Sequence, residues 1–341
     1  MAIINLVSDT VTKPTAGMLK AMMAAEVGDD VFREDPTVRA LEEKCAALLG
    51  HAAGLFCPSG TMTNQIALKV HTRPLDEVIC DEMSHIFQYE VGGYAFNSGI
   101  GVNLLQTPNG ILDAPQVEAA VRPRFDWLPK STLVVIENTC NRGGGSWYPI
   151  ERIRAIREVC RSRGLALHLD GARLFNALAE SRNTPAEIGA EVDSVSLCLS
   201  KGLGAPVGSV LTGSVEFIAE ARRVRKVMGG GMRQAGYLAA AGIYALDRQV
   251  ERLREDHAHA RMLASALQNL PYVSGIRPVQ TNIVIFDLAP QVSTAAFLAY
   301  LESRGVKASA FGPMTIRFVT HLDVSESQIK EAIQVLRNYP G

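Results

Sequence analysis

The chain has 341 residues, of which 47% are hydrophobic and 20% are charged. This is an ordinary globular composition, and the length is typical of two domains rather than of one core. The 34 basic and 35 acidic side chains give a net charge of −1, so we expect neither a nucleic-acid partner nor a polybasic membrane surface.

The chain begins with MAIINLVSDTVTKP, which has no basic stretch followed by an apolar run, so we expect no signal peptide. No segment approaches the ~20 apolar residues of a membrane-spanning helix. The six cysteines form no CxxC pair, which argues against a zinc cluster and against a disulfide scaffold. We therefore expect a cytoplasmic protein without a bound metal.

Short apolar runs alternate with helical patterns through most of the chain. The clearest helix is expected over 36–49, because Asp35 can cap its start and Gly50 can end it. Strands are expected over 54–57, 77–80, 133–137, 165–169 and 194–199, with further helices from near Met62 and over 150–163. Strands separated by helices predict an α/β fold with a mostly parallel sheet covered on both faces.

A long helical pattern begins near Leu246, where apolar residues recur at helical spacing through Leu267. We expect it to lead from a large domain into a small α+β domain, made of strand 282–286, helix 294–304, strand 315–319 and helix 325–337. We place the division near residue 250. Residues 1–249 then form the large domain, N-terminal segment included, and residues 250–341 form the small one.

Polar residues follow every strand of the predicted parallel sheet. They are Ser59, Gly60 and Thr61 after the first strand, Asp81, Ser84 and His85 after the second, Asn138 and Thr139 after the third, Asp170 and Arg173 after the fourth, and Ser200 and Lys201 after the fifth. Ligands of open α/β proteins bind at the carboxyl ends of the strands. We therefore expect an anion site, an imidazole, a carboxylate and an amine to converge at one edge of the sheet.

The segment from Pro58 to Thr61 opens a helix, and the unpaired N–H groups of a helix N-terminus bind phosphate. The same segment can also be an ordinary helix cap, in which Ser59 bonds the first turn. It is not a Walker loop, because the GxxxxGK[ST] spacing is absent.

Lys201 and Asp170 each have two interpretations. Lys201 follows a buried strand, where a desolvated amine can form a Schiff base, or it is an exposed lysine at a strand end. Asp170 keeps the nitrogen of a pyridine ring protonated, or it forms a structural ion pair with Arg173. Because one strand–helix–strand step separates Lys201 from Asp170, both can lie at neighbouring strand ends.

Three other side chains also have an ordinary and a functional interpretation. His85 is a plain loop histidine, or its imidazole stacks on a flat ligand. Arg317 lies in an apolar strand and faces solvent, or it points inward, where a substrate carboxylate would balance its charge. Arg233 follows three glycines at 229–231 and can reach an anion or a neighbouring subunit.

An anion site, an amine, a carboxylate and a stacking imidazole at one sheet edge together specify the cofactor pyridoxal phosphate. We expect its phosphate at the helix N-terminus, its aldehyde at Lys201 and its ring nitrogen at Asp170.

Motifs run along nearly the whole chain. They are SDTVTKP at 8–14, GDDV at 28–31, EDPT at 34–37, PSGTM at 58–62, SHI at 84–86, IENT at 136–139, HLDGAR at 168–173, CLSKG at 198–202, GGGMRQAG at 229–236 and TN at 281–282. In this order they resemble the low-specificity L-threonine aldolases of the β-eliminating lyase/threonine aldolase family. The resemblance implies the fold type I (aspartate aminotransferase-like) architecture of pyridoxal-phosphate enzymes, with a small C-terminal domain.

The resemblance also implies roles for individual residues. Those that hold the cofactor are Lys201 through a Schiff base, Asp170 at the ring nitrogen, His85 stacked on the ring, Ser59, Gly60, Thr61 and Ser200 at the phosphate, and Arg173. Those that hold the substrate carboxylate are Ser8, Arg173 and Arg317. Arg233 would reach the cofactor from a partner subunit, so the resemblance implies a dimer as the active unit and a homotetramer as the assembly.

The reaction implied by the resemblance is retro-aldol cleavage of L-threonine or L-allo-threonine, and of related β-hydroxy-α-amino acids, to glycine and an aldehyde. His85 or an ordered water would take the proton of the β-hydroxyl group. Many family members have a histidine ahead of the strand at 133–137, where this chain has Trp127. The threo/erythro preference is therefore left open.

Two alternatives differ from this reaction. Another pyridoxal-phosphate-dependent β-eliminating lyase would share the fold, act on a different amino acid and release pyruvate and ammonia. A nicotinamide-dependent dehydrogenase or a nucleotide-binding module would need GxGxxG after an early strand, and the sequence has none there. For the aldolase and for the other β-eliminating lyase, the binding partner is a small amino-acid substrate.

Overall fold

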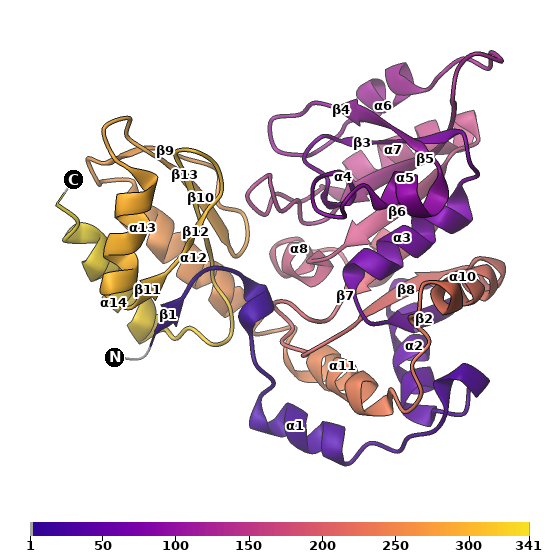
Figure 1. Cartoon of the computed structure of the whole chain (residues 1–341), viewed down its shortest axis with the longest axis horizontal. Helices are drawn as coiled ribbons and strands as arrows, with labels where there is room; N and C mark the ends of the chain where they lie inside the picture. Colours follow the sequence, from indigo (N-terminus) through magenta and orange to yellow (C-terminus); the bar gives the residue numbers. More distant parts are fainter. Residues whose placement is uncertain (1–2, 341) are drawn as a thin grey trace.

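The computed structural model describes residues 3–340, which form a large and a small part (Figure 1). The large part is built on a seven-stranded sheet. In spatial order its strands are β2 (Ala53–Cys57), β8 (Ser209–Gly213), β7 (Ser194–Cys198), β6 (Ala166–Gly171), β5 (Lys130–Glu137), β3 (Asp76–Asp81) and β4 (Gly101–Leu105).

Only β8 runs against the other strands of this sheet, since it pairs antiparallel with both β2 and β7. All remaining neighbours are parallel, so the predicted mostly parallel sheet is confirmed. The five expected strands are all present. β4 and β8 were missing from the prediction because each contains only two or three apolar residues, too few for a clear strand pattern.

Helices pack on both faces of this sheet. On one face lie α3 (Gly60–His71), α4 (His85–Gln88), α5 (Gly93–Ser98) and α10 (Val215–Val227), and on the other lie α2 (Pro36–Leu49), α7 (Ile150–Arg163), α8 (Leu174–Glu180), α9 (Pro185–Gly189) and α11 (Gly236–Arg248), with α6 (Ala114–Ala120) against α7. Successive strand residues point to opposite faces, so Val134 and Leu133 of β5 belong to different cores. Because of this alternation, helices bury both faces of the sheet. The carboxyl edge is not covered by these helices and is open for a site.

The ends of α2 are as expected. The Val38 N–H donates to Asp35 Oδ1 at 3.0 Å, and Gly50 ends the helix with a φ of +67°. The single long helix expected from Leu246 is wrong. The chain instead ends α11 at Arg248, turns, and begins α12 (Leu253–Leu267). The sequence does not reveal this break, because the apolar spacing continues across it and no glycine or proline marks it.

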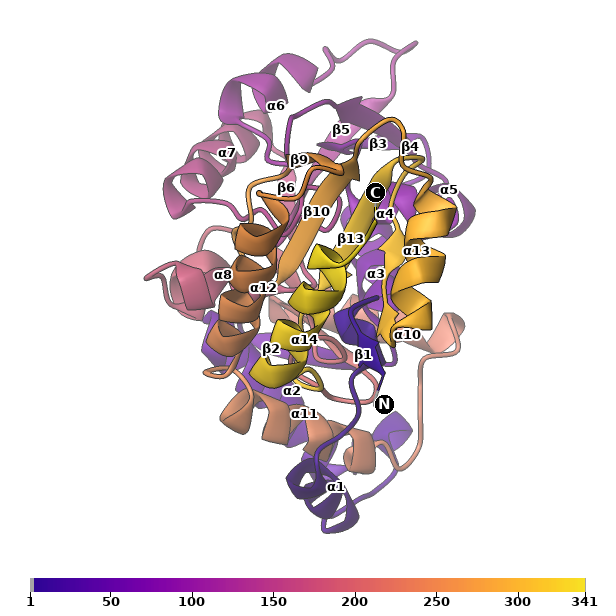
Figure 2. The same ribbon diagram turned by 90° about the vertical axis from the view of Figure 1, so that its left-hand side faces the viewer.

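The small part has a four-stranded antiparallel sheet in the order β12 (Ser309–Ala310), β13 (Thr315–Val319), β10 (Ile283–Leu288) and β9 (Val273–Ile276), packed with α12, α13 (Thr294–Ser303) and α14 (Glu326–Arg337). The N-terminal strand β1 (Ile4–Asn5) lies beside α14 (Figure 2) and pairs with β11 (Val306–Lys307). Ile4 and Leu6 belong to this second core. The division of the chain near residue 250 stays our proposal, with β1 lying against the small part.

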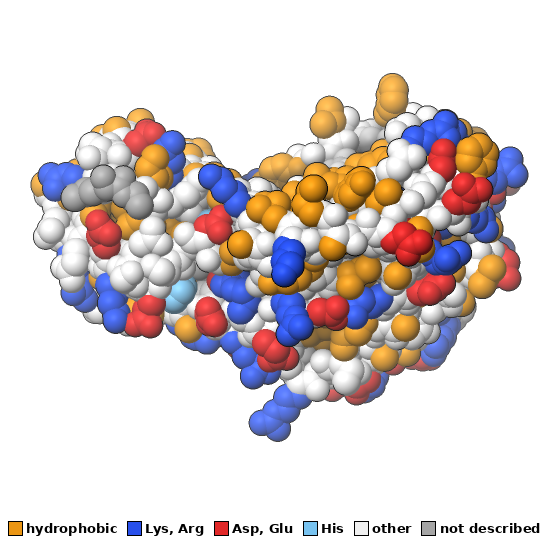
Figure 3. Space-filling model, turned by 90° about the horizontal axis from the view of Figure 1, so that it is seen from below, with side chains coloured by type: hydrophobic (Ala, Val, Ile, Leu, Met, Phe, Trp, Pro, Cys, Tyr) orange, Lys and Arg blue, Asp and Glu red, His pale blue; other side chains and the backbone are white. Residues whose placement is uncertain are grey.

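After β1 the chain passes to the large part through a short 3-10 helix, η1 (Asp9–Val11), and then α1 (Ala16–Met23) packs on α11. Figure 3 shows the two parts as lobes with an indentation between them. Within residues 3–340 no helix combines the length and the apolar composition needed to cross a membrane.

Candidate active site

A cavity of about 430 Å³ opens between the carboxyl edge of the large sheet and the small part. It is lined by Ser8, Thr10, His85, Tyr89, Glu137, Asn141, Arg173, Lys201, Ser309, Ala310, Phe311 and Arg317. Five residues singled out in the sequence therefore meet there: Ser8, His85, Arg173, Lys201 and Arg317. They come from the N-terminal segment, the large part and the small part.

Lys201 reaches the cavity from the loop that follows β7. Its main-chain oxygen accepts hydrogen bonds from the Gly204 N–H at 2.8 Å and from the Thr12 hydroxyl at 3.2 Å. Among the described residues that line the cavity, it is the one with a primary amine. A partly buried lysine at this position is suited to bind an aldehyde covalently.

Asp170 lies near the end of β6, buried to 3% exposure, directly opposite Glu137 of β5. Asn64 Nδ2 donates to its Oδ2 at 2.8 Å, and the Ala172 N–H donates to its Oδ1 at 3.1 Å. One of the two interpretations of Asp170, a structural ion pair with Arg173, is wrong. The guanidinium of Arg173 bonds Asp9 instead. The Asp170 carboxylate is therefore not neutralised by that arginine.

His85 is the first residue of α4 and borders the cavity. Its Nδ1 lies 2.9 Å from Glu90 Oε1, and its main-chain N–H donates to Glu137 Oε2 at 2.9 Å. Burial lowers the pKa of His85, but the bond to Glu90 and the negative charge of Asp170 outweigh it, so the pKa is raised. Because a carboxylate only accepts, Nδ1 carries a proton and Nε2 is the nitrogen left for a ligand.

Two arginines line the cavity, one from the large part and one from the small part. Arg173 donates to both carboxylate oxygens of Asp9. Arg317 comes from β13, donates to Asn141 Oδ1 at 2.8 Å, and lies 4.8 Å from the centre of the Phe311 ring. Its Nε is buried and has no hydrogen-bond partner among the described residues. Burial and the charge of Arg173 lower the pKa of Arg317 to about 10, so an anion between the two arginines would relieve both effects.

The expected phosphate site lies at the N-terminus of α3, outside the lining of this cavity. Ser59 caps the helix by accepting from the Met62 N–H at 3.2 Å, and Gly60 is its first residue. A Cβ atom on Gly60 would lie 3.9 Å from the sulfur of Cys198, whose sulfur is 3.5 Å from the Ser200 hydroxyl. The helix N-terminus and the loop that carries Lys201 are therefore neighbours.

Arg233 and Trp127 do not line the cavity of their own chain. The side chain of Arg233 is 55% exposed, bonds Asp29 at 2.8 Å, and lies 5.9 Å from the centre of the Phe32 ring. Trp127 is 76% exposed and stacks on Phe125 with ring centres 4.8 Å apart. Neither side chain therefore belongs to the group of residues that this cavity brings together.

Four buried polar residues of the site escaped the sequence analysis: Asp9, Asn64, Glu90 and Glu137. Glu137 accepts N–H groups from His85 and Asn141, while burial and the charge of Asp170 raise its pKa to about 7. A carboxylate at the end of an apolar strand was a usable signal for Glu137. The other three are placed by long-range packing that no local pattern reveals.

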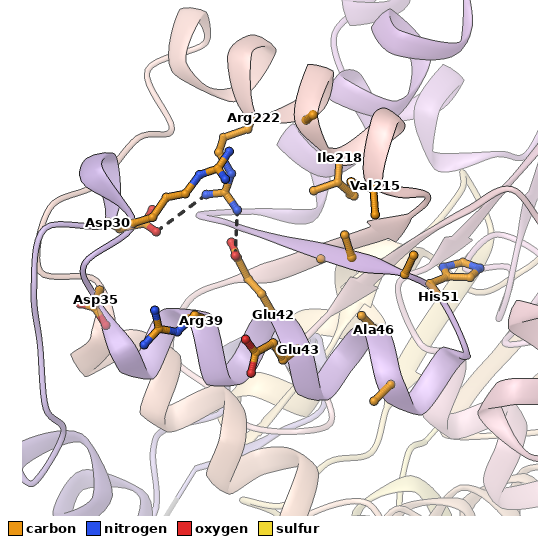
Figure 4. Close-up of a pocket in the computed structure, with 16 residues that line it drawn as sticks. Asp30, Asp35, Arg39, Glu42, Glu43, Ala46, His51, Val215, Ile218 and Arg222 are labelled. Atoms are coloured by element: carbon orange, nitrogen blue, oxygen red, sulfur yellow. Dashed lines mark hydrogen bonds and ion pairs between the residues drawn. The ribbon is translucent and has the colours of Figure 1, made fainter.

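A second cavity, of about 490 Å³, lies between α2 and α10 (Figure 4). Arg222 crosses one side of it, with its guanidinium 2.8 Å from Glu42 and 3.9 Å from Asp30. These charges pair with one another, and the strand residues that border the cavity begin β2 rather than end it. It therefore carries none of the groups expected of the active site.

The fold and the residues at the strand ends define a class of protein: an α/β enzyme whose mostly parallel sheet presents a lysine, an aspartate and a helix N-terminus at its carboxyl edge. The chain belongs to the beta-eliminating lyase family, whose model it matches over residues 5–291. The members of this family are lyases.

The relatives of the chain agree with this assignment. It is 42% identical over 329 residues to the low specificity L-threonine aldolase of Escherichia coli K12, which covers 96% of each chain. It is also 42% identical over 334 residues to the probable low-specificity L-threonine aldolase 2 of Arabidopsis thaliana, covering 96% of this chain and 94% of the other. The solved structure of Leishmania major threonine aldolase superposes with a TM-score of 0.84 at 24% identity over 98% of each chain, which confirms the fold.

Proposed function

We propose that this protein is a pyridoxal-phosphate-dependent aldolase that cleaves L-threonine, L-allo-threonine and related β-hydroxy-α-amino acids to glycine and an aldehyde. The observation that carries the proposal is the cavity that brings the Lys201 amine together with Arg173 and Arg317. The names of the relatives support the reaction, since they are low-specificity threonine aldolases of both bacterial and plant origin.

The residues of the site fit the cofactor. Lys201 would hold its aldehyde carbon, Asp170 its ring nitrogen, and Ser59, Gly60, Thr61 and Ser200 its phosphate. The buried Asp170 carboxylate has one strong side-chain donor in Asn64 and can accept a further proton-bearing group. When bound, pyridoxal phosphate supplies an electron sink for the electron pair left at Cα when the Cα–Cβ bond breaks.

The substrate carboxylate would bind between Arg173 and Arg317, next to Ser8. The partnerless Nε of Arg317 supports this placement, because a carboxylate accepts two parallel N–H groups from a guanidinium. Holding the carboxylate in place sets the direction of the Cα–Cβ bond. This direction decides which bond at Cα breaks. His85, or a water that it binds, would take the β-hydroxyl proton, since Nε2 is its free nitrogen.

The active unit is proposed to be a dimer in which Arg233 contributes to the cofactor site of the partner, within a homotetramer. Support comes from the exposure of Arg233 and from the apolar ring beside it, since Phe32 is 68% exposed. Hydrophobic side chains gather on the large lobe in the view of Figure 3. Apolar surface of this kind marks an interface between chains. We place the protein in the cytoplasm.

The test is a spectrum and a product assay on the purified protein. The bound cofactor should give a visible absorbance band that borohydride abolishes, and added L-threonine should release acetaldehyde. Lys201→Ala should stay folded by circular dichroism and lose both signals. Release of pyruvate and ammonia instead of acetaldehyde would favour the other β-eliminating lyase, and a Lys201→Ala protein that keeps the band would refute the assignment of the lysine.

A further inference from the structure

A seam of buried polar side chains runs behind Asp170, between α3 and the large sheet. Asn64 and His71 both belong to α3 and lie two turns apart on one face of the helix. His168 of β6 and Ser194 of β7 are paired in register beneath that face. The seam leads from Asp170 to the beginning of β7, and beyond Asn64 its residues have no part in the proposed reaction.

Asn64 sits between two carboxylates. Its Nδ2 donates to Asp170 Oδ2 at 2.8 Å and to Glu90 Oε1 at 2.9 Å. The orientation of the amide follows from this, because an amide oxygen facing two carboxylates would be repelled. Asn64 Oδ1 therefore faces the other way, where His168 Nε2 lies at 3.3 Å and must donate.

The same logic fixes the rest of the seam. Burial lowers the pKa of His168 to about 3 and that of His71 to about 4, so both rings are neutral. With its proton on Nε2, His168 accepts at Nδ1 from the Ser194 hydroxyl at 2.8 Å. The Ser194 oxygen then accepts from His71 Nε2 at 2.8 Å. Every hydrogen bond points the same way, toward Asp170.

We propose that His168 is a positioning residue for the cofactor: it fixes the amide of Asn64 so that both of its N–H bonds reach carboxylates, and thereby holds the Asp170 carboxylate in place facing the ring nitrogen. The inference rests on the proposed function, since it assigns a role toward pyridoxal phosphate. Without the His168 donor, the side-chain amide of Asn64 can turn over. Asp170 and Glu90 then lose the N–H donor that they share. Glu137 still faces Asp170 from the neighbouring strand.

The seam also has an ordinary explanation, in which it merely satisfies buried polar groups. The two explanations differ in what a variant changes. A structural loss weakens the whole protein and every ligand equally, whereas a loss of positioning weakens only the contact to the ring nitrogen. An analogue of pyridoxal phosphate in which a C–H replaces the ring nitrogen isolates that contact, because it cannot bond Asp170.

The variants are His168→Met, which removes the donor, and His168→Gln, whose side-chain amide can restore a donor near the position of Nε2. Ser194→Ala is a smaller change that leaves His168 free to move its proton to Nδ1, and it serves if His168→Met does not fold. The matched control is His51→Met. His51 is partly buried, whereas His168 is fully buried, and it bonds Thr212 at 2.8 Å and the Gly189 oxygen at 3.0 Å, with no hydrogen bond to the seam among the described residues.

The experiment measures the dissociation constants of the apo-proteins for pyridoxal phosphate and for the carbon analogue, and the ¹⁵N chemical shift of bound cofactor labelled at the ring nitrogen. We expect His168→Met and Ser194→Ala to bind pyridoxal phosphate roughly tenfold or more weakly, the worth of one hydrogen bond to a charged group, and to bind the analogue like the wild type. The ring nitrogen should shift toward its unprotonated form, and His168→Gln should restore both readouts.

Equal weakening for both ligands, or an unchanged nitrogen shift in a folded His168→Met or Ser194→Ala protein, would overturn the inference. A wild-type protein that does not bind pyridoxal phosphate at all would instead refute the proposed function. The two failures are therefore distinguishable in one set of titrations.

Discussion

Arg173 donates hydrogen bonds from Nε and Nη2 to the two carboxylate oxygens of Asp9, each at 2.7 Å, and both side chains are almost fully buried. Asn282 adds a third contact by donating to Asp9 Oδ2 at 3.3 Å. Three regions far apart in sequence meet at this carboxylate: the N-terminal segment, the loop after β6 and the start of the small sheet. Burial raises the pKa of Asp9, but Arg173, Lys201 and Asn282 together lower it more, so the pKa of Asp9 lies well below its usual value and the carboxylate stays ionised.

Asp9→Asn should destabilise the protein strongly. It leaves the buried Arg173 charge without a counter-charge, which typically costs about 3–5 kcal/mol of unfolding free energy. Because the pKa of Asp9 is lowered in the folded state, its contribution is present above the ordinary carboxyl pKa and is lost as the pH falls below it. Urea unfolding at neutral and acidic pH measures both effects. Glu118→Gln, in an exposed pair with Arg163, should cost less than about 1 kcal/mol; an equal loss there would contradict the argument.

Glu90→Gln should lower the pKa of His85. The present pKa is raised because the Glu90 bond and nearby carboxylates outweigh burial. The resulting stabilisation is complete below the ordinary histidine pKa of about 6.5 and disappears as the pH rises through the higher folded value. Titration of His85 by NMR measures the change, with Glu82→Gln as the control, since Glu82 bonds Gln106 and not His85. An unshifted titration in Glu90→Gln would show that Asp170 and Glu137 alone raise the pKa.

Two inactive variants should restore activity when their subunits are mixed. Lys201→Ala removes the amine, and Arg233→Ala removes the arginine proposed to reach the partner. After random reassembly, half of the dimers are hybrids with one intact site out of two, so about a quarter of the wild-type activity should return. Aldehyde release after mixing and reassociation measures it. Mixtures that stay inactive although hybrids form would mean that Arg233 acts within its own chain.

Arg317→Lys should weaken substrate binding more than cofactor binding. A lysine cannot offer two parallel N–H groups to a carboxylate, so KM should rise roughly ten- to hundredfold, the worth of one charged hydrogen bond. The absorbance of the bound cofactor should not change, because Arg317 is not placed at the cofactor. Arg304→Lys, at the end of α13, is the control and should leave KM unchanged. A large loss of cofactor in Arg317→Lys would reassign this arginine.

Local sequence patterns predicted most of the large sheet and the convergence of His85, Arg173 and Lys201 at its carboxyl edge, where all three line one cavity. This is because strand ends are visible in the sequence as a change from apolar to polar residues, and parallel strands place those ends together. Ser8 was placed there only by the family resemblance, and Arg317 by its apolar strand together with that resemblance.

Hydrogen-bond and ion-pair partners that lie far apart in the sequence could not be predicted in the same way. Arg173 was paired with Asp170 in one interpretation because only three residues separate them, but its partner is 164 residues away. Asn64 likewise reaches Asp170 across 106 residues. Pairing at such separations is decided when the sheet and the small part pack, and no local spacing carries that information. The break between α11 and α12 is missed for the same reason.

The segment from Ile4 to Met23 contributes to both parts of the molecule. Its strand β1 pairs with the small part, Ser8 lines the cavity, Asp9 pairs with Arg173, and α1 packs on α11 of the large part. A truncation that reaches Asp9 would remove packing contacts from both lobes. It would also leave the buried charge of Arg173 without its carboxylate partner. For protein engineering, this means that a purification tag placed directly against Ile4 risks reduced activity for reasons unrelated to the chemistry, and that catalytic comparisons between variants should keep the same N-terminal sequence.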